Sequence, residues 1–383
     1  MLGIARWVFS LGRPVCVELG HRQLVAEKEG ARVCTPASAL TMTSHTGSTK
    51  MTLKGNVSPP TFAEAMAGAV VQLSVVFYVW FEHSSARECL PDPRNCLYDP
   101  WGRQVVITLG LTLVLWLYSL RTLPSTGTSD PSVVDRCWSI APVAYCWHFF
   151  WSLPVFAAAA APRLAIMTVL TTAWGVRLTW NFARKGGFSG GEDYRWVEIR
   201  TWFKPGLQWE SFNLLFICGF QQLVVLAFSS PAALVAQNPS PLNALDAVAT
   251  VLCALCIVGE TVADNQMFDF QTEKYRRIGA GEPAGPYGRG FIESGLWAYS
   301  RHPNYFCEVS LWACFYLFAV AATGQFVSWA GLGTVFLAAL FVLPRASLDV
   351  TESLSSRKYK TYPEYQARVS RFVPWFPASS KRQ

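Results

Sequence analysis

Apolar stretches separated by short polar loops fill the chain from about residue 60 almost to its C-terminal tail. Each stretch, wound as a helix, is about long enough to cross a hydrocarbon layer of ~30 Å. The pattern therefore predicts an all-α, polytopic transmembrane bundle of about eight helices. The predicted spans are residues 62–81, 105–120, 137–157, 164–182, 212–228, 242–263, 305–322 and 327–343.

The first 60 residues lack this pattern. Residues 1–15 hold Arg6 and Arg13 but no acidic residue, and residues 35–50 are rich in Ser and Thr. This composition favours a disordered or targeting N-terminal tail over residues 1–60. It leaves a membrane-embedded domain over residues 61–377 and a short tail over residues 378–383.

Composition separates this chain from ordinary soluble enzymes. Hydrophobic residues make up 51% of the chain and charged residues only 15%, whereas soluble chains carry about 25% charged residues. The formal net charge is +7, but the basic residues are scattered through short loops and form no nucleic-acid patch. We therefore expect the lipid bilayer, with anionic head groups or a phosphorylated cofactor, as partners, and no nucleic acid. Of the 11 cysteines, only Cys253 and Cys256 have CxxC spacing, and they lie inside an apolar stretch, where a thiol acts as a small hydrophobic group. No zinc or haem motif occurs, so no metal site is predicted.

Loop charges predict how the bundle is oriented. The loops after the fourth and sixth predicted spans are rich in Lys and Arg, and so is the tail after the eighth, whereas loop 229–241 has none. The positive-inside rule then places both termini and the even-numbered loops in the cytosol. The endoplasmic reticulum is the membrane we expect. Cys89 and Cys96 fall in the first lumenal loop, where the compartment allows a disulfide.

Four polar clusters fall on the predicted cytosolic side. The first combines Arg177, in WGVRLTW, with the loop KGGFSGGEDYRW, whose glycines either let the backbone approach a ligand or form a flexible turn beside snorkelling arginines. The second places Glu260 and Asp264 four residues apart on one helix face, with Gln271 further along it. These two carboxylates either bind hydroxyl or amide groups of a cofactor or pair with a cation, such as Arg177 or Arg301, for structure alone.

The third cluster lies at the start of the seventh predicted span, in SRHPNYFCE. Pro303 suits the first turn of a helix, and the free backbone N–H groups of that turn, beside Arg301 and His302, make a site for an anion. Asn304 and Glu308 are four residues apart, so both point inward. The alternative interpretation is an interfacial aromatic belt with a capped helix.

The fourth cluster follows the eighth predicted span. Glu352 precedes an amphipathic run of cations and tyrosines, SSRKYKTYPEYQAR. Such a run either lies on the membrane surface or folds back as a lid over a cofactor.

Several of these motifs together resemble a known family. The segment GLWAYSRHPNYFCE, preceded by ADNQMFDFQ and followed by TESLSSRKYKTYPEYQARVSRFVP, is similar to the uncharacterised-domain (DUF1295-like) branch of the steroid 5-alpha-reductase family of multi-span membrane proteins. The motifs WGVRLTW and GGEDYRW resemble the same branch, so the similarity covers about residues 134–377. The RHPNY element alone is less specific, because isoprenylcysteine and phospholipid methyltransferases carry a similar turn.

This resemblance implies a helical bundle whose cytosolic half holds NADPH. Glu260 stands where characterised steroid reductases have a cofactor-contacting Asn, and Arg345 is the nearest candidate for an Arg that they place before their last tyrosines. The cofactor-binding residues implied by motif are Asp264, Tyr299, Arg301, His302, Asn304, Tyr305, Glu308, Glu352, Tyr359 and Tyr362.

The implied reaction is the NADPH-dependent reduction of a carbon–carbon double bond conjugated to a carbonyl, in a sterol or another lipid enone. The developing enolate oxygen needs an acid or a hydrogen-bond donor. Characterised reductases use a Glu/Tyr pair in their first helices, and Glu64, Tyr78 and Glu82 are candidates here by residue type only. Two alternatives stay open: an S-adenosylmethionine-dependent methyltransferase of lipids or isoprenylcysteine, and a non-catalytic membrane protein that retains the fold.

Overall fold

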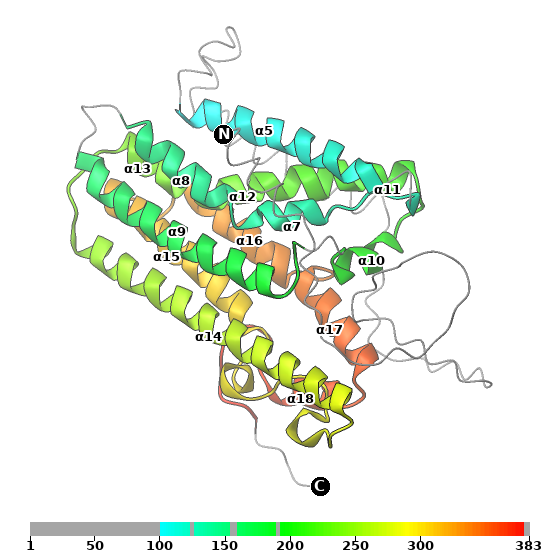
Figure 1. The fold of residues 1–383 in the computed structure, drawn as a ribbon. Coiled ribbons are helices and arrows are strands. Elements are labelled where there is room, and N and C mark those ends of the chain that lie inside the picture. Colours follow the sequence, from blue (N-terminus) through cyan, green and yellow to red (C-terminus); the bar gives the residue numbers. More distant parts are fainter. Residues whose placement is uncertain (1–99, 123–125, 154–158, 189–191, 379–383) are drawn as a thin grey trace.

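A computed structural model describes residues 100–122, 126–153, 159–188 and 192–378, and every regular element in these ranges is helical (Figure 1). The first half comprises α5 (Pro100–Ser119), η1 (Leu120–Thr122), α7 (Ser132–Trp138), α8 (Ala141–Trp151), α9 (Ala161–Arg184), α10 (Tyr194–Arg200), α11 (Leu207–Phe212), the π-helical η3 (Asn213–Phe220) and α12 (Gln221–Ser229). The second half comprises α13 (Pro231–Gln237), α14 (Ala244–Ala280), η4 (Gly285–Tyr287), η5 (Gly295–Ala298), α15 (Pro303–Thr323), η6 (Trp329–Gly331), α16 (Leu332–Val342), α17 (Ser347–Lys358) and α18 (Tyr362–Arg368). Outside the described residues lie the predicted span 62–81, the donor candidates Glu64, Tyr78 and Glu82, and Cys89 and Cys96.

Five helical segments of the described residues are long and apolar enough to cross a membrane, which supports an integral membrane protein. They are Trp101–Thr122, Leu207–Ser229, Ala244–Ala280, Pro303–Thr323 and Trp329–Lys358. Three of them contain a predicted span in full, and Ala244–Ala280 and Trp329–Lys358 contain all but the first two residues of theirs.

Two further predicted spans have a different form in the structure. The predicted span 137–157 corresponds mainly to α8, which has only 11 residues. The predicted span 164–182 lies inside α9, which has 24 residues but is not among the five apolar segments, because polar residues such as the buried Arg163 and Arg177 lower its hydropathy. The total of eight spans therefore stays a prediction.

The longest helix, α14, has clear start and stop signals. Asn243 and Asp246 form a capping box at its start, and Gly281 ends it with a left-handed φ of 66°. Its 37 residues give a length of about 55 Å at 1.5 Å per residue. This exceeds a hydrocarbon layer of ~30 Å, so the C-terminal part of α14 reaches beyond the apolar layer.

Helix α15 packs against α14 and joins it to the centre of the bundle (Figure 1). Pro303 lies in its first turn, and Gly324 ends it with a φ of 71°. The Trp312 side chain of α15 is 1% exposed and packs edge-on against Trp174 of α9, with ring centroids 5.0 Å apart. These contacts fix where the polar start of α15 faces α9 and α14.

Helix α5 lies at the edge of the bundle (Figure 1) and has one strongly apolar exposed face. Leu109, Leu113 and Leu117 are each more than half exposed on it. A contiguous apolar face of this kind is expected of a helix that contacts lipid.

We predict that α16 tolerates no side chain at Gly333. A Cβ built there would collide with the backbone of Ala227 and Phe228 in α12. Gly333→Ala is therefore expected to destabilise the protein by about 1–3 kcal/mol through overpacking, seen as a lower thermal midpoint in detergent. Gly110→Ala, on α5, is the matched control because no atom lies within 4 Å of its Cβ. Equal midpoints for the two variants would contradict the close packing of α12 and α16.

Candidate functional site

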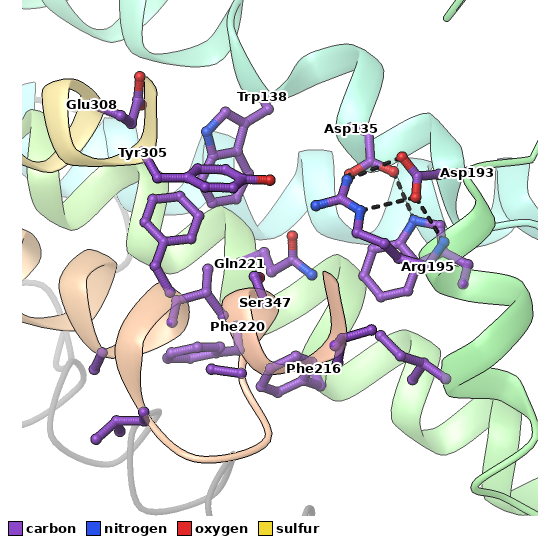
Figure 2. Close-up of a pocket in the computed structure, with 18 of the residues that line it drawn as sticks. Asp135, Trp138, Asp193, Arg195, Phe216, Phe220, Gln221, Tyr305, Glu308 and Ser347 are labelled. Atoms are coloured by element: carbon purple, nitrogen blue, oxygen red, sulfur yellow. Dashed lines mark hydrogen bonds and ion pairs between the residues drawn. The ribbon is translucent and has the colours of Figure 1, made fainter. Parts of the chain in front are cut away.

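One large cavity, of about 580 Å³, lies among α7, α9, α14, α15, η3 and the α16–α17 corner. Its lining is polar at two ends and aromatic between them (Figure 2). Its volume falls within the range of small-molecule and cofactor sites, about 300–1,000 Å³. The combination of convergent polar groups and an apolar wall makes it the candidate functional site.

Carboxylates from α14 dominate the first polar end. Arg177 of α9 forms ion pairs with both Glu260 and Asp264, and its Nη1 lies 2.7 Å from Asp264 Oδ2. Lys185 lies 3.6 Å from Asp264 and is 40% exposed at its side chain. Two interpretations of this carboxylate pair were open, cofactor binding and pairing with a cation. The structure contains the ion pairs with Arg177 that the second interpretation expects.

Helix α15 adds Asn304 and Glu308 to the same end. The Glu308 carboxylate accepts hydrogen bonds from the indole N–H groups of Trp174, at 2.7 Å, and Trp312, at 3.1 Å. The Asn304 amide donates weakly to Asp264, at 3.5 Å, while its Oδ1 is buried without a hydrogen-bond partner. A buried amide oxygen that lacks a donor costs about 1–3 kcal/mol, so a ligand N–H or O–H group would be favoured there.

The second polar end is built from α7 and the segment that enters α10 (Figure 2). Asp193 caps α10 by accepting from the Arg195 backbone N–H at 2.9 Å, and its carboxylate also binds the Arg195 guanidinium at 2.9 and 3.1 Å. Asp135 of α7 accepts from the Trp196 indole at 2.7 Å and lies 3.7 Å from the same guanidinium. One arginine therefore serves two carboxylates.

Burial raises the pKa of the Asp135 carboxyl to about 6. Arg195 opposes this increase, and the neighbouring Asp193 adds to it. Asp193 itself is also desolvated, but its charge pairing and hydrogen bonds with Arg195 hold its pKa below the usual range. The two carboxyls of this end are thus protonated over different pH ranges.

Stacked phenylalanines form the wall between the two ends. Phe212, Phe216 and Phe220 line the cavity, with successive ring centroids 5.0 and 5.4 Å apart. They lie at the end of α11 and along η3, and π-helical turns are frequent at functional sites. Tyr305 reaches into the cavity from α15 and packs on Phe341 at 4.8 Å (Figure 2). The result is an aromatic wall beside polar groups.

The Arg301 group lies apart from this cavity. Arg301 binds both oxygens of Glu352, at 2.7 and 3.1 Å, and donates to the backbone carbonyls of Gln366 and Val369. His302 contacts the same Glu352 carboxylate at 3.0 Å. None of these three cluster residues lines the cavity. The cluster ties α15 and α17 to the C-terminal segment.

The structure thus divides the residues that the resemblance implies. Tyr299 is half exposed and packs on Phe376, while Tyr359 and Tyr362 surround Phe291 in a separate aromatic group. The implied residues that line the cavity are Asp264, Asn304, Tyr305 and Glu308, together with Glu260 and Arg345. Cofactor binding by any of them stays a prediction.

Asp135 is a cavity residue that the sequence analysis did not identify. Its side chain is 15% exposed and lies beside Arg195, 60 positions later in the chain. The local signal was an acidic residue directly before an apolar stretch, in VVDRCW. This signal is weak, because an acid in the first turn of a helix is common for capping reasons alone.

Comparison with known proteins gives a family but no activity. Residues 123–371 match the model of a family described as "Protein of unknown function (DUF1295)". An uncharacterized protein of Schizosaccharomyces pombe is 36% identical over 277 residues, which cover 70% of this chain and 79% of that protein. No solved structure matches the chain.

We predict that Arg301 is needed for stability. Arg301→Ala would leave the buried Glu352 with only His302 and the Gln366 amide as partners and would remove the Arg301 donor from two carbonyls, at a cost of about 3–5 kcal/mol. The variant should show a lower thermal midpoint and faster proteolysis near residue 370. Arg289→Ala is the matched control, because its pairs with Glu293 and Glu364 lie at the surface and contribute about 1 kcal/mol or less. Similar losses in both variants would contradict this role.

We predict a pH effect on stability from Asp135. Its pKa is about 6 in the folded protein and about 3.9 in an unfolded chain. Between these values the folded state holds the extra proton, so the free energy of unfolding falls as the pH rises, by up to about 3 kcal/mol. Thermal midpoints of the wild type and Asp135→Asn, measured in detergent from about pH 4 to 7, should show a steeper fall in the wild type. Parallel curves would contradict the prediction.

Proposed function

The chain belongs to the DUF1295 family of proteins of unknown function, and from this premise we propose that it is a membrane-bound, NADPH-dependent oxidoreductase. Its proposed reaction is reduction of a conjugated carbon–carbon double bond in a sterol or another lipid enone. The observation that carries the proposal is a single cavity that combines an unpaired buried amide oxygen, on Asn304, with an aromatic wall. The motif resemblance to steroid 5-alpha-reductases adds support for the reaction class.

The α14–α15 end of the cavity suits the nicotinamide half of the cofactor. The free Asn304 Oδ1 can accept from a carboxamide N–H, and Asp264 and Glu260 can accept from ribose hydroxyls. Lys185 and Arg345 line the same cavity and supply positive charge for phosphate groups. When bound, NADPH supplies a hydride.

The aromatic wall suits the lipid substrate. Phe212, Phe216 and Phe220 stack on one another and line the cavity, and burying apolar surface against them contributes about 25 cal/mol per Å². Leu343 also lines the cavity, and 52% of its surface is exposed. A hydrophobic substrate would therefore reach the cavity from the lipid side, while the cofactor enters from the cytosol.

A second function is favoured by the charge of the cavity. Five lining carboxylates stand against three lining cations, and such an excess of negative charge suits a positively charged ligand. The sulfonium group of S-adenosylmethionine is a ligand of this kind. The alternative is therefore a methyltransferase acting on a lipid or an isoprenylcysteine.

We predict that NADPH stabilises the purified protein and that Asn304 contributes to its binding. A ligand at 100 times its dissociation constant should add about 2.7 kcal/mol to the free energy of unfolding. Asn304→Ala should raise the dissociation constant about tenfold through the lost hydrogen bond. Thermal shift titrations with NADPH, NADH and S-adenosylhomocysteine would measure both effects.

Asn238→Ala is the control for this titration, because Asn238 binds the Leu234 carbonyl at the end of α13 and does not line the cavity. It should bind NADPH like the wild type. Stabilisation by S-adenosylhomocysteine without stabilisation by NADPH would favour the methyltransferase. Stabilisation by none of the three would contradict both proposals and favour a non-catalytic protein.

A further inference from the structure

Asp135 is the carboxyl with the least charge compensation at its end of the cavity. Its 3.7 Å separation from Arg195 exceeds the 2.9 and 3.1 Å contacts that bind Asp193 to the same guanidinium. The other close contact of Asp135 is the neutral indole N–H of Trp196. One cation cannot fully neutralise two carboxylates, so Asp135 is the member of this pair that holds a proton more readily.

At the opposite end, Asp264 is the carboxylate held most firmly as an acceptor, with Arg177 at 2.7 Å and Lys185 at 3.6 Å. Glu308 accepts from two neutral indoles there. Figure 2 shows Asp135 and Glu308 on opposite sides of the space into which Tyr305 projects. A ligand in the cavity would thus have a charge-paired acceptor, Asp264, at one end and Asp135 at the other.

We propose that Asp135 is the proton-transfer residue of this cavity, acting on an oxygen atom of the bound lipid. This inference rests on the proposed reductase function for its reaction. The earlier candidates for the proton donor, Glu64, Tyr78 and Glu82, rested on residue type only. Asp135 is a donor candidate within the described residues.

The proton transfer breaks one O–H bond and forms another. The O–H bond of Asp135 breaks and an O–H bond forms on the substrate carbonyl oxygen, while the conjugated system accepts the hydride electron pair. Asp135 is left as a carboxylate, which Arg195 and the Trp196 indole stabilise. Solvent then returns a proton to Asp135, and the substrate enol becomes the saturated ketone.

The charged groups around Asp135 are compatible with this cycle. Asp193 disfavours its charged form, while Arg195 and Arg136 favour it. From α15, Tyr305 faces Arg195 across the cavity. Burial, together with these opposing charges, places the pKa of Asp135 at about 6, near the range in which a general acid operates efficiently.

A labelling experiment tests the acid without any substrate. Dicyclohexylcarbodiimide is apolar and adds only to protonated carboxyls, so the full-length protein in detergent should be labelled at Asp135 at about pH 5. The yield on the Asp135 peptide, measured by mass spectrometry, should fall at least tenfold by about pH 8. The Asp193 peptide is the internal control, because its carboxylate is ionised at both pH values. An unlabelled Asp135 at pH 5, with its peptide recovered, would overturn the inference.

A kinetic experiment separates this inference from the proposed function. With a lipid enone and NADPH, Asp135→Asn should lower kcat about 10²–10⁴-fold, with KM and the NADPH thermal shift nearly unchanged, and Asp135→Glu should recover part of the loss. Wild-type turnover in Asp135→Asn would overturn the inference and leave the reductase function intact. If Asp135 is labelled but the protein neither binds nor oxidises NADPH, the reductase function is overturned. The assignment of Asp135 as a protonated carboxyl of the cavity is then retained.

Discussion

Arg177 compensates two carboxylates inside an apolar bundle, and the geometry of the site depends on this pairing. Its guanidinium lies between α9 and α14 and binds Glu260 and Asp264. Removing one partner of such a buried group typically costs about 3–5 kcal/mol, so the pairing fixes the positions of the two helices. Asn304 and Glu308 face this point from α15. The position of the acidic end of the cavity therefore depends on Arg177 of α9, on the two α14 carboxylates that it binds, and on the polar side chains of α15 beside them.

The chain uses its buried charges in two different ways. Around Arg301 the hydrogen-bonding groups are matched by the Glu352 carboxylate and by backbone carbonyls, which gives a closed structural joint. Around the cavity the matching is incomplete, with a spare oxygen on Asn304 and a weakly compensated Asp135. Incompletely matched polar groups in a cavity are where a ligand gains free energy. Both regions contain buried charged residues. The difference is that hydrogen-bonding groups are matched around Arg301 and incompletely matched around the cavity.

Local signals predicted the helices better than the site. The apolar run and the start and stop residues of α14 are local, and Pro303 marks the start of α15 in the sequence. Helical spacing also placed Asn304 and Glu308 on one face. The direction of Arg301 depends instead on carbonyls more than 60 positions later, which no spacing rule contains. The π-helical η3 looks like any apolar run in sequence, because its hydrogen-bond register leaves no compositional mark.

The joint at Arg301 has a consequence for the order in which the protein matures. Its backbone N–H donates to the Ser370 carbonyl, and its side chain needs Gln366 and Val369. A ribosome makes these partners last, after all five apolar segments have been synthesised. Until then Arg301 has its counter-charge, Glu352, but lacks the carbonyl acceptors that complete the joint. A chain that stops before residue 366 would have its apolar helices but not this closure.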